Sequence, residues 1–231
     1  MLVDRVESGI PGLDKLIQGG FVKGSVNLLA GQTGTGKTIF GMQYLLHGLK
    51  KGGKALYISL EQGKEDVLSD VSSFGWDAEL KKFISQGKLL ILSLEPTSIE
   101  DLSTQTIDAA KKVNASRLVL DSLSVATMGW KMGELDVTKL RSETFSYIKS
   151  LKSLGLTGLL ITEIPEEKDK SLSRFGFEEF LADGVIVLSL LDVGGDFFTN
   201  IRVRKMRRTK HKKEYYPFEI TTNGLKLLSK D

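Results

Sequence analysis

The stretch VNLLAGQTGTGKT, residues 26–38, carries the strongest fold signal in the chain. It opens with VNLLAG, a continuous apolar run that ends in glycine, which is typical of a buried strand. From Gly31 to Thr38 the sequence matches the pattern G-x-x-x-x-G-K-[ST], and a helix-like stretch, 38–50, follows. Because a strand before this loop and a helix after it are the context that the motif requires, the stretch predicts a P-loop nucleotide-binding fold.

The motif assigns a task to each part of the loop. Its glycines let backbone N–H groups surround phosphate oxygens, and the N-terminus of the following helix adds partial positive charge. Lys37 is expected to reach the β- and γ-phosphates, and the Thr38 hydroxyl to bind Mg²⁺. The expected nucleotide contacts are therefore Gly31, Gln32, Thr33, Gly34, Thr35, Gly36, Lys37, Thr38 and Ile39.

Outside the loop, short apolar runs alternate with amphipathic stretches. Strands are expected at 55–61, 88–94, 117–123 and 158–163. A helix is expected to follow the first of these strands and to end at about Ser73, and two more are expected from Ser98 to about Val113 and through 140–154. Such alternation predicts an α/β fold with a mainly parallel central sheet flanked by helices. After Glu163, runs follow without a helix between them and predict antiparallel strands at the C-terminal end. No repeat or linker interrupts the chain, so we expect a single domain over 1–231.

Three of the expected strands end in polar side chains at the sheet edge where the P-loop lies. Asp121 ends the run RLVLD and suits the acid that holds Mg²⁺ through water, with a turn-capping aspartate as the alternative. Glu61 ends the run ALYISLE. If that strand neighbours the P-loop strand, Glu61 faces the γ-phosphate as the catalytic base; the alternative is a helix N-cap. Thr162 and Glu163 end a third strand and are candidates for sensing the γ-phosphate.

Composition and missing motifs exclude several classes of protein. The chain has 41% hydrophobic residues, 26% charged residues and a net charge of +3, and this charge does not mark the whole molecule as a nucleic-acid binder. It has no cysteine, and therefore neither a disulfide nor a thiolate metal site. We see no signal peptide and no apolar run of roughly 18–20 residues, so we expect a cytoplasmic protein without a membrane partner. The absence of N-K-x-D weakens a GTPase interpretation, and that of L-S-G-G-Q a transporter ATPase; a small-molecule kinase stays open.

A basic segment lies near the C-terminus. From Arg202 to Lys213 there are eight Lys/Arg and one His in twelve residues. If the strand here keeps a period of two, Lys205 and Arg207 share a face with the apolar residues Ile201 and Val203. Two cations aimed together suit a compact polyanion such as a γ-phosphate. A nucleic-acid stripe and a solvated edge strand remain open alternatives.

Several motifs together resemble the KaiC family of RecA-superfamily ATPases. They are SGIPGLDKLIQGGFVKGSVNLLAGQTGTGKT, YISLEQ, SFGWD, RLVLDSLS, RFGFEEFLADGVIVL and KMRRTKHKKEYYPFEIT, which cover nearly the whole chain. The resemblance implies a RecA-like core, ATP and Mg²⁺ as ligands, and ATP sites shared between the subunits of a hexameric ring.

The resemblance also assigns individual residues. Glu61 matches the catalytic glutamate of the family, but the second Glu that usually follows is Gln62 here. Lys205 and Arg207 fall on a pair that touches the γ-phosphate of the neighbouring subunit, and His211 matches a further residue of that tail. Arg208 replaces a glycine that is common at its position, so the local backbone is expected to differ.

These observations predict a Mg²⁺-dependent ATPase that forms a ring and transmits a conformational change to a protein partner. One alternative is a DNA-associated relative of the recombinases. Its DNA-binding loops would be 126–136, with one Lys against two acids, and 164–180, with three Lys/Arg against five acids, so nucleic acid is not favoured. The other alternative is an ATP-sensing scaffold that does not hydrolyse ATP, which Gln62 makes plausible.

Overall fold

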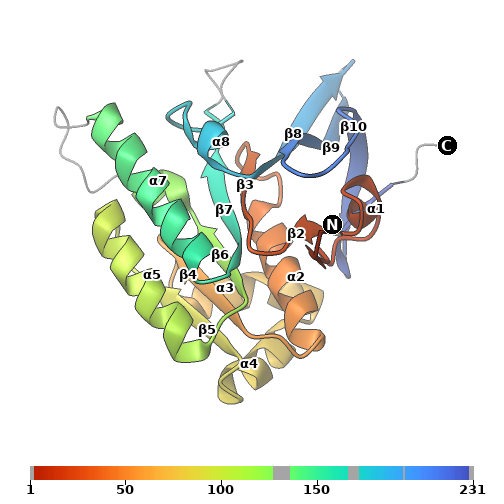
Figure 1. Cartoon of the computed structure of the whole chain (residues 1–231). Coiled ribbons are helices and arrows are strands. Elements are labelled where there is room, and N and C mark those ends of the chain that lie inside the picture. The colour runs from red at the N-terminus through yellow and green to blue at the C-terminus, as the bar shows by residue number, and fades with distance from the viewer. Residues whose placement is uncertain (1–2, 127–135, 166–171, 195, 229–231) are drawn as a thin grey trace.

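The computed structural model describes residues 3–126, 136–165, 172–194 and 196–228. Within these ranges, nine strands form one sheet in the order β11-β10-β9-β8-β3-β7-β6-β4-β5, and β1 pairs with β2 in a separate small sheet (Figure 1). The strands are β1 (Arg5–Val6), β2 (Phe21–Val22), β3 (Val26–Gly31), β4 (Ala55–Ser59), β5 (Leu89–Ser93), β6 (Arg117–Asp121), β7 (Thr157–Glu163), β8 (Gly184–Val193), β9 (Asp196–Met206), β10 (Tyr215–Thr221) and β11 (Gly224–Leu227).

Helices cover both faces of the sheet, which explains why its central strands are apolar on both faces (Figure 1). The helices are α1 (Leu13–Leu16), α2 (Lys37–Lys50), α3 (Lys64–Asp70), the 3₁₀ helix η1 (Ser72–Phe74), α4 (Asp77–Ser85), α5 (Ile99–Val113), α6 (Leu123–Ala126), α7 (Val137–Ser153) and α8 (Glu178–Leu181). Neighbouring residues of β3 point to opposite faces. Leu29 packs into a core with residues of α2, α3 and α4, and Leu28 into a second core with residues of α5 and α7.

The predicted α/β class and the mainly parallel sheet are confirmed. β3 pairs in parallel with β7 and β8, and β4 pairs in parallel with β5 and β6. The antiparallel tail is confirmed for β9, β10 and β11. Its first strand, β8, differs from the prediction because it runs parallel to β3 and only then turns back into β9.

The strands predicted at 55–61, 88–94 and 117–123 are each two residues too long, and the premise that the first of them neighbours the P-loop strand is wrong. β4 ends at Ser59, so Glu61 lies two residues beyond it, and β6 ends at Asp121, so Leu123 already begins α6. The ladder between the two strands stops at the pair Ser59–Asp121. In the sheet order, β7 and β6 separate β4 from the P-loop strand β3. Any approach of Glu61 to the P-loop therefore depends on the segment after the strand.

The helix predicted to end near Ser73 is also interrupted. α3 stops at Asp70, η1 follows, and Gly75 has a φ of +68°, a left-handed conformation that favours glycine, before α4 begins. The helix start predicted at Ser98 is confirmed, because the Ser98 hydroxyl oxygen caps α5 by accepting a hydrogen bond from the Asp101 backbone N–H at 3.1 Å.

A β-bulge makes the predicted alternation in β9 wrong. Val185 pairs with Lys205 while the next residue of β8 pairs with Val203, so β9 contains one extra residue between these pairs. Ile201, Val203 and Met206 all enter the core, and Lys205 points away from it. The strand then ends at Met206, before Arg207. The shared face of Lys205 with Ile201 and Val203 is thus lost because of the bulge.

No helix in the described ranges is long and apolar enough to cross a bilayer. The two loops considered for DNA binding, 126–136 and 164–180, include residues 127–135 and 166–171, which lie outside the described residues.

Candidate nucleotide-binding site

The P-loop follows β3 at the carboxyl ends of the parallel strands. Gly34 and Gly36 have φ values of +78° and +86°, left-handed conformations that favour glycine. Gly31 is needed for a different reason. A Cβ at this position would lie 2.6 Å from the Thr35 hydroxyl oxygen and 2.8 Å from the carbonyl oxygen of Leu188. The glycines therefore permit the tight turn that the motif predicted.

The loop is closed by hydrogen bonds to one carbonyl. The Gln32 carbonyl oxygen accepts bonds from the Lys37 ammonium at 2.8 Å and from the hydroxyl of the buried Thr35 at 2.8 Å. The side-chain oxygen of Gln32 also lies 3.4 Å from the backbone nitrogen of Leu190, which donates to it. Lys37 is thus held over the loop, where incoming phosphate oxygens compete with a neutral carbonyl for its charge.

Three carboxylates lie around Lys37. Burial lowers the pKa of its ammonium, while the negative charges of Glu163, Asp121 and Glu61 raise it, Glu163 most of all. The structure therefore brings the strand-end acids that the sequence singled out to the same lysine, even though they follow three different strands.

Asp121 and Thr38 are in direct contact. The Thr38 hydroxyl donates to Asp121 Oδ2 at 2.7 Å, and the buried Tyr57 hydroxyl donates to the same oxygen at 2.8 Å. Burial raises the pKa of Asp121, and these two hydrogen bonds lower it. Burial and the Asp121 charge raise the pKa of Tyr57 well above its ordinary value, so Tyr57 remains a hydrogen-bond donor. The sequence analysis did not select Tyr57, although a hydroxyl in the middle of a mainly apolar strand could have indicated a polar contact there.

These oxygens fit a hard cation such as Mg²⁺. In P-loop proteins the metal takes the threonine hydroxyl, phosphate oxygens and waters bonded to the strand-end aspartate. In the described part of the chain, no group of three or more His, Cys, Asp or Glu side chains could hold a metal by itself. Thr38 and Asp121 would therefore supply only part of the ligand set of such a cation, and phosphate oxygens would have to complete it.

Glu61 is exposed and is held next to Asp121. The Ser122 hydroxyl, which the sequence interpretation overlooked, donates to Glu61 Oε1 at 2.7 Å. The backbone nitrogen of Gln62 donates to the Ser59 hydroxyl at 2.9 Å, and its side-chain amide donates to Asp70 at 2.8 Å. Glu61 does not cap α3, whose N-cap is a glycine. The segment after β4 thus brings the Glu61 carboxylate close enough for its charge to act on Lys37, although β6 and β7 lie between β4 and β3.

Thr162 and Glu163 are placed differently at the end of β7. Thr162 is fully buried, and its hydroxyl lies 3.1 Å from that of Ser124. Glu163 is partly exposed, and the backbone nitrogen after it, that of Ile164, donates to the Gly31 carbonyl oxygen at 3.1 Å. Of this pair, Glu163 is the residue presented to the P-loop.

A pocket of about 350 Å³ opens beside the loop. It is lined by Gly34, Gly36, Lys37, Thr38, Ile39, Asp70, Val71 and Ile220. Ile220 belongs to β10, and a Cβ at Gly36 would lie 2.7 Å from its Cδ1. The C-terminal tail therefore forms one wall of the site, which no local sequence pattern indicated.

The tail cations lie at the other end of β3 from the P-loop. Met206 pairs with Gly184, which pairs with Asn27 near the start of β3. Because five steps of about 3.3 Å separate the first and last of its 6 residues, the two ends of β3 lie roughly 16 Å apart, farther than a side chain can reach. Lys205 and Arg207 therefore cannot contact a nucleotide in the P-loop of their own chain.

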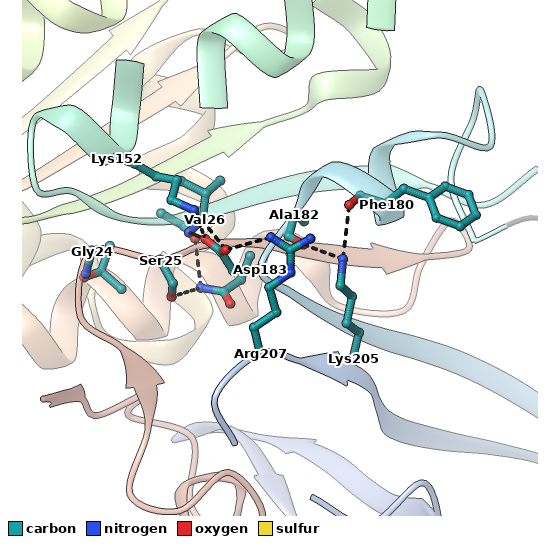
Figure 2. A network of polar contacts seen from close by, with 12 residues as sticks. Gly24, Ser25, Val26, Lys152, Phe180, Ala182, Asp183, Lys205 and Arg207 are labelled. Carbon is teal, nitrogen blue, oxygen red and sulfur yellow. Dashed lines mark hydrogen bonds and ion pairs between the residues drawn. The ribbon is translucent and has the colours of Figure 1, made fainter. Parts of the chain in front are cut away.

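Both cations are engaged around the segment after α8, as Figure 2 shows. The Arg207 guanidinium lies 3.5 Å from the carboxylate of Asp183, which is 5% exposed and also binds Lys152 at 2.9 Å. The Lys205 ammonium donates to the carbonyl oxygens of Glu179, Phe180 and Ala182 at 3.0, 3.2 and 2.7 Å. All three donors of Lys205 are thus used within the chain, whereas Arg207 remains 53% exposed.

We expect Lys205→Ala to lower the free energy of unfolding by about 1 kcal/mol, because three carbonyl oxygens at the end of α8 lose a charged donor but can still bind water. Urea unfolding would measure this. Lys210→Ala, which removes an exposed cation of the same segment, should change the value by less than about 0.5 kcal/mol. Equal effects of the two substitutions would contradict a structural role for Lys205.

The other two tail residues that the sequence singled out, Arg208 and His211, follow β9. Arg208 has a φ of +57°, the left-handed conformation that a glycine would favour. The arginine is therefore accommodated without the change in local backbone that the sequence led us to expect. His211 lies in the irregular segment between β9 and β10, with its Nδ1 3.2 Å from the Lys212 carbonyl oxygen.

Comparison with known proteins gives a consistent result. A family profile described as "ATPase: KaiC" matches residues 6–231. The chain is 31% identical to a circadian clock oscillator protein KaiC of Picosynechococcus sp., over 97% of this chain and 44% of that protein. It is also 31% identical to a UPF0273 protein of Aeropyrum pernix, over 97% of this chain and 93% of that protein.

A solved structure agrees with these relatives. The crystal structure of a KaiC-like protein from the hyperthermophilic archaeon Pyrococcus horikoshii matches with a TM-score of 0.87 and 38% identity, covering 99% of this chain and 100% of that one. The chain thus spans less than half the length of the curated clock protein but nearly the whole of both archaeal proteins.

Proposed function

The chain belongs to the KaiC family of ATPases and has its RecA-like, ATP-binding fold, and from this premise we propose that it hydrolyses ATP with Mg²⁺ in a ring of identical subunits. The observation that supports hydrolysis most strongly is the surroundings of the P-loop lysine, Lys37. The charges of Asp121, which accepts a hydrogen bond from Thr38, and of Glu61 both act on it. The family resemblance favours six subunits, a single domain and a conformational output to a protein partner.

The side chains divide the work of hydrolysis. Thr38 and Asp121 would hold Mg²⁺, which neutralises charge on the phosphate oxygens when it is bound. Lys37 exchanges the carbonyl oxygen of its own loop for phosphate oxygens. Glu61 accepts the proton of the water that attacks the γ-phosphorus, while the bond to the bridging oxygen breaks and ADP leaves. The Ser122 hydroxyl, bonded to Glu61 Oε1, orients the carboxylate and leaves its second oxygen for the water.

The other half of the site would come from a neighbouring subunit. Arg207 and Lys205 are too far from their own P-loop, so any γ-phosphate that they contact belongs to another copy. Arg207 is the better candidate because its guanidinium is exposed and, among the described residues, contacts a single carboxylate at 3.5 Å. Lys205 would have to leave three carbonyl oxygens to do the same, which predicts a smaller contribution.

The direct test is phosphate release with purified chain and ATP, with and without a chelator of divalent cations. We expect release that stops when Mg²⁺ is removed, together with a mass in solution that corresponds to a ring when Mg²⁺·ATP is present. ATP binding without any phosphate release would favour the non-hydrolysing scaffold instead.

We expect Glu61→Gln to leave ATP bound and to lower the hydrolysis rate by about 10²–10⁴-fold, the usual contribution of a general base. Single-turnover phosphate release and ATP affinity would be measured separately. Glu65→Gln is the matched control, because it removes an exposed carboxylate four residues away on α3. Hydrolysis by Glu61→Gln at the rate of the control would mean that the base lies elsewhere.

A further inference from the structure

A second pocket lies at the opposite edge of the sheet, away from the P-loop. Its volume is about 440 Å³. It is lined by Arg5, Val6, Glu7, Lys23, Gly48, Lys51, Gly53, Ser116, Arg117, Gly155 and Thr157. Most of these residues lie at the starts of β4, β6 and β7 or at the end of α2, whereas the P-loop and its acids follow the carboxyl ends of the strands. The pocket is therefore separate from the candidate ATP site.

A buried arginine forms one wall of this amino-edge pocket. Arg117 is only 8% exposed, and burial lowers the pKa of its guanidinium. Its Nη1 donates to the Tyr44 carbonyl oxygen at 2.7 Å, and the guanidinium lies 4.5 Å above the Tyr44 ring. A Cβ at Gly48 would overlap Arg117 Nε, so the glycine leaves the space in which the guanidinium lies. Among the described residues, Arg117 forms no ion pair.

Two further cations of the pocket, Arg5 and Lys23, also form no ion pair among the described residues. Arg5 donates to the carbonyl oxygens of Ile17, Gly20 and Arg208 and to a hydroxyl, all of them neutral acceptors. Lys23 is exposed and has no carboxylate partner in the described ranges. Two arginines and a lysine thus line one pocket, and none of them forms an ion pair with a carboxylate in the described part of the chain.

One carboxylate lines the pocket, and it already has partners. Glu7 lies 2.7 Å from His47 and 3.5 Å from Lys51, and both contacts lower its pKa. The C-terminus of α2 adds roughly half a negative charge from its dipole. The pocket is lined by four cationic side chains, those of Arg5, Lys23, Lys51 and Arg117, and by a single carboxylate, that of Glu7. Even with the partial charge of the helix C-terminus, its lining therefore carries a net positive charge.

We propose that this amino-edge pocket binds a small molecule carrying phosphate groups. The charges of Glu7 and Asp14 act on the Arg117 guanidinium, but neither carboxylate lies at ion-pair distance, so a bound anion would offset more of the cost of burying this charge. Arginine forks with lysines beside them suit phosphate oxygens. The volume falls within the roughly 300–1,000 Å³ of small-molecule sites, so the ligand is larger than a single inorganic phosphate. The proposal does not depend on the ring or on ATP hydrolysis.

The pocket is connected to the tail cations through one side chain. Arg5, which lines it, donates to the Arg208 carbonyl oxygen at 3.0 Å and to the Thr209 hydroxyl at 2.7 Å. Arg207 and Arg208 form the turn that follows β9, and Thr209 comes directly after it. A ligand that draws the Arg5 guanidinium into the pocket therefore competes with the contacts that fix this turn.

The test uses pyrophosphate as the probe and calorimetry at low salt. Because the P-loop also binds pyrophosphate, the titration is made on the Lys37→Ala chain and repeated on the wild-type chain saturated with Mg²⁺·ADP. We expect binding in both, and we expect the added pair Lys23→Ala and Lys51→Ala to weaken it by about tenfold or more. Both lysines are exposed, so the pair should fold normally.

The matched control is the pair Lys82→Ala and Lys149→Ala, which removes two exposed cations of α4 and α7 that do not line the pocket. Its affinity for pyrophosphate should equal that of the parent chain. The proposal is overturned if neither parent binds pyrophosphate at millimolar concentration, or if the control pair loses as much affinity as the pocket pair. Tighter binding of citrate than of pyrophosphate would overturn the assignment to phosphate.

Discussion

Replacing Lys37 by alanine is expected to abolish ATP binding or to weaken it by about two orders of magnitude or more. The lysine is more than half removed from solvent, lies over the loop and already donates to one of its carbonyl oxygens, so its charge is in place for the β- and γ-phosphates. Removing it also leaves Glu163, Asp121 and Glu61 facing the phosphates without a compensating cation. Calorimetric titration with Mg²⁺·ATP measures the change.

The control for this experiment is Lys149→Ala, which removes one exposed cation of α7. It should bind ATP with the affinity of the wild-type chain. Unchanged affinity in Lys37→Ala, with the same urea unfolding curve as the control, would contradict the assignment of the P-loop as the nucleotide site.

Replacing Arg207 by alanine is expected to lower hydrolysis by up to roughly 10³-fold, because arginines supplied by a neighbouring subunit stabilise transition-state charge by factors of about 10³–10⁵ in other P-loop enzymes. The effect should appear in the turnover rate more than in ATP affinity, since charge on the γ-oxygens grows in the transition state. The mass in solution should stay that of the wild-type protein.

Arg208→Gly is the matched control for Arg207→Ala. It removes the adjacent charge and places glycine where φ is +57°, so the turn should keep its shape. We expect hydrolysis close to the wild-type rate. If instead Arg207→Ala hydrolyses ATP normally but binds DNA more weakly, with the salt slope reduced by about one unit, the recombinase-like alternative would be favoured.

The parts of this molecule that local patterns determine were predicted from the sequence. A continuous apolar run, a glycine-rich loop and a helix identified β3, the P-loop and α2, because their conformations depend on neighbouring residues. Asp121 was placed correctly for the same reason, since a buried strand delivers its last side chain to the sheet edge.

Long-range arrangement was not accessible in this way. The position of Glu61 depends on strand order, and the sheet puts two strands between β4 and β3. The face of Lys205 depends on a bulge that only the pairing of β9 with β8 reveals. Ile220 reaches the P-loop from the other end of the chain, and Asp183 acquires its cations only when α7, β3 and the tail come together (Figure 2).

The central claim is that one chain supplies Glu61 and a neighbouring chain supplies Arg207 to the same ATP. It is tested most directly by mixing Glu61→Gln with Arg207→Ala, each expected to hydrolyse ATP much more slowly than the wild-type chain, under conditions where labelled subunits are seen to exchange. Some interfaces in the mixture then combine an intact Glu61 with an intact Arg207, and phosphate release should reappear. No recovery of hydrolysis despite demonstrated exchange would contradict a site shared between subunits.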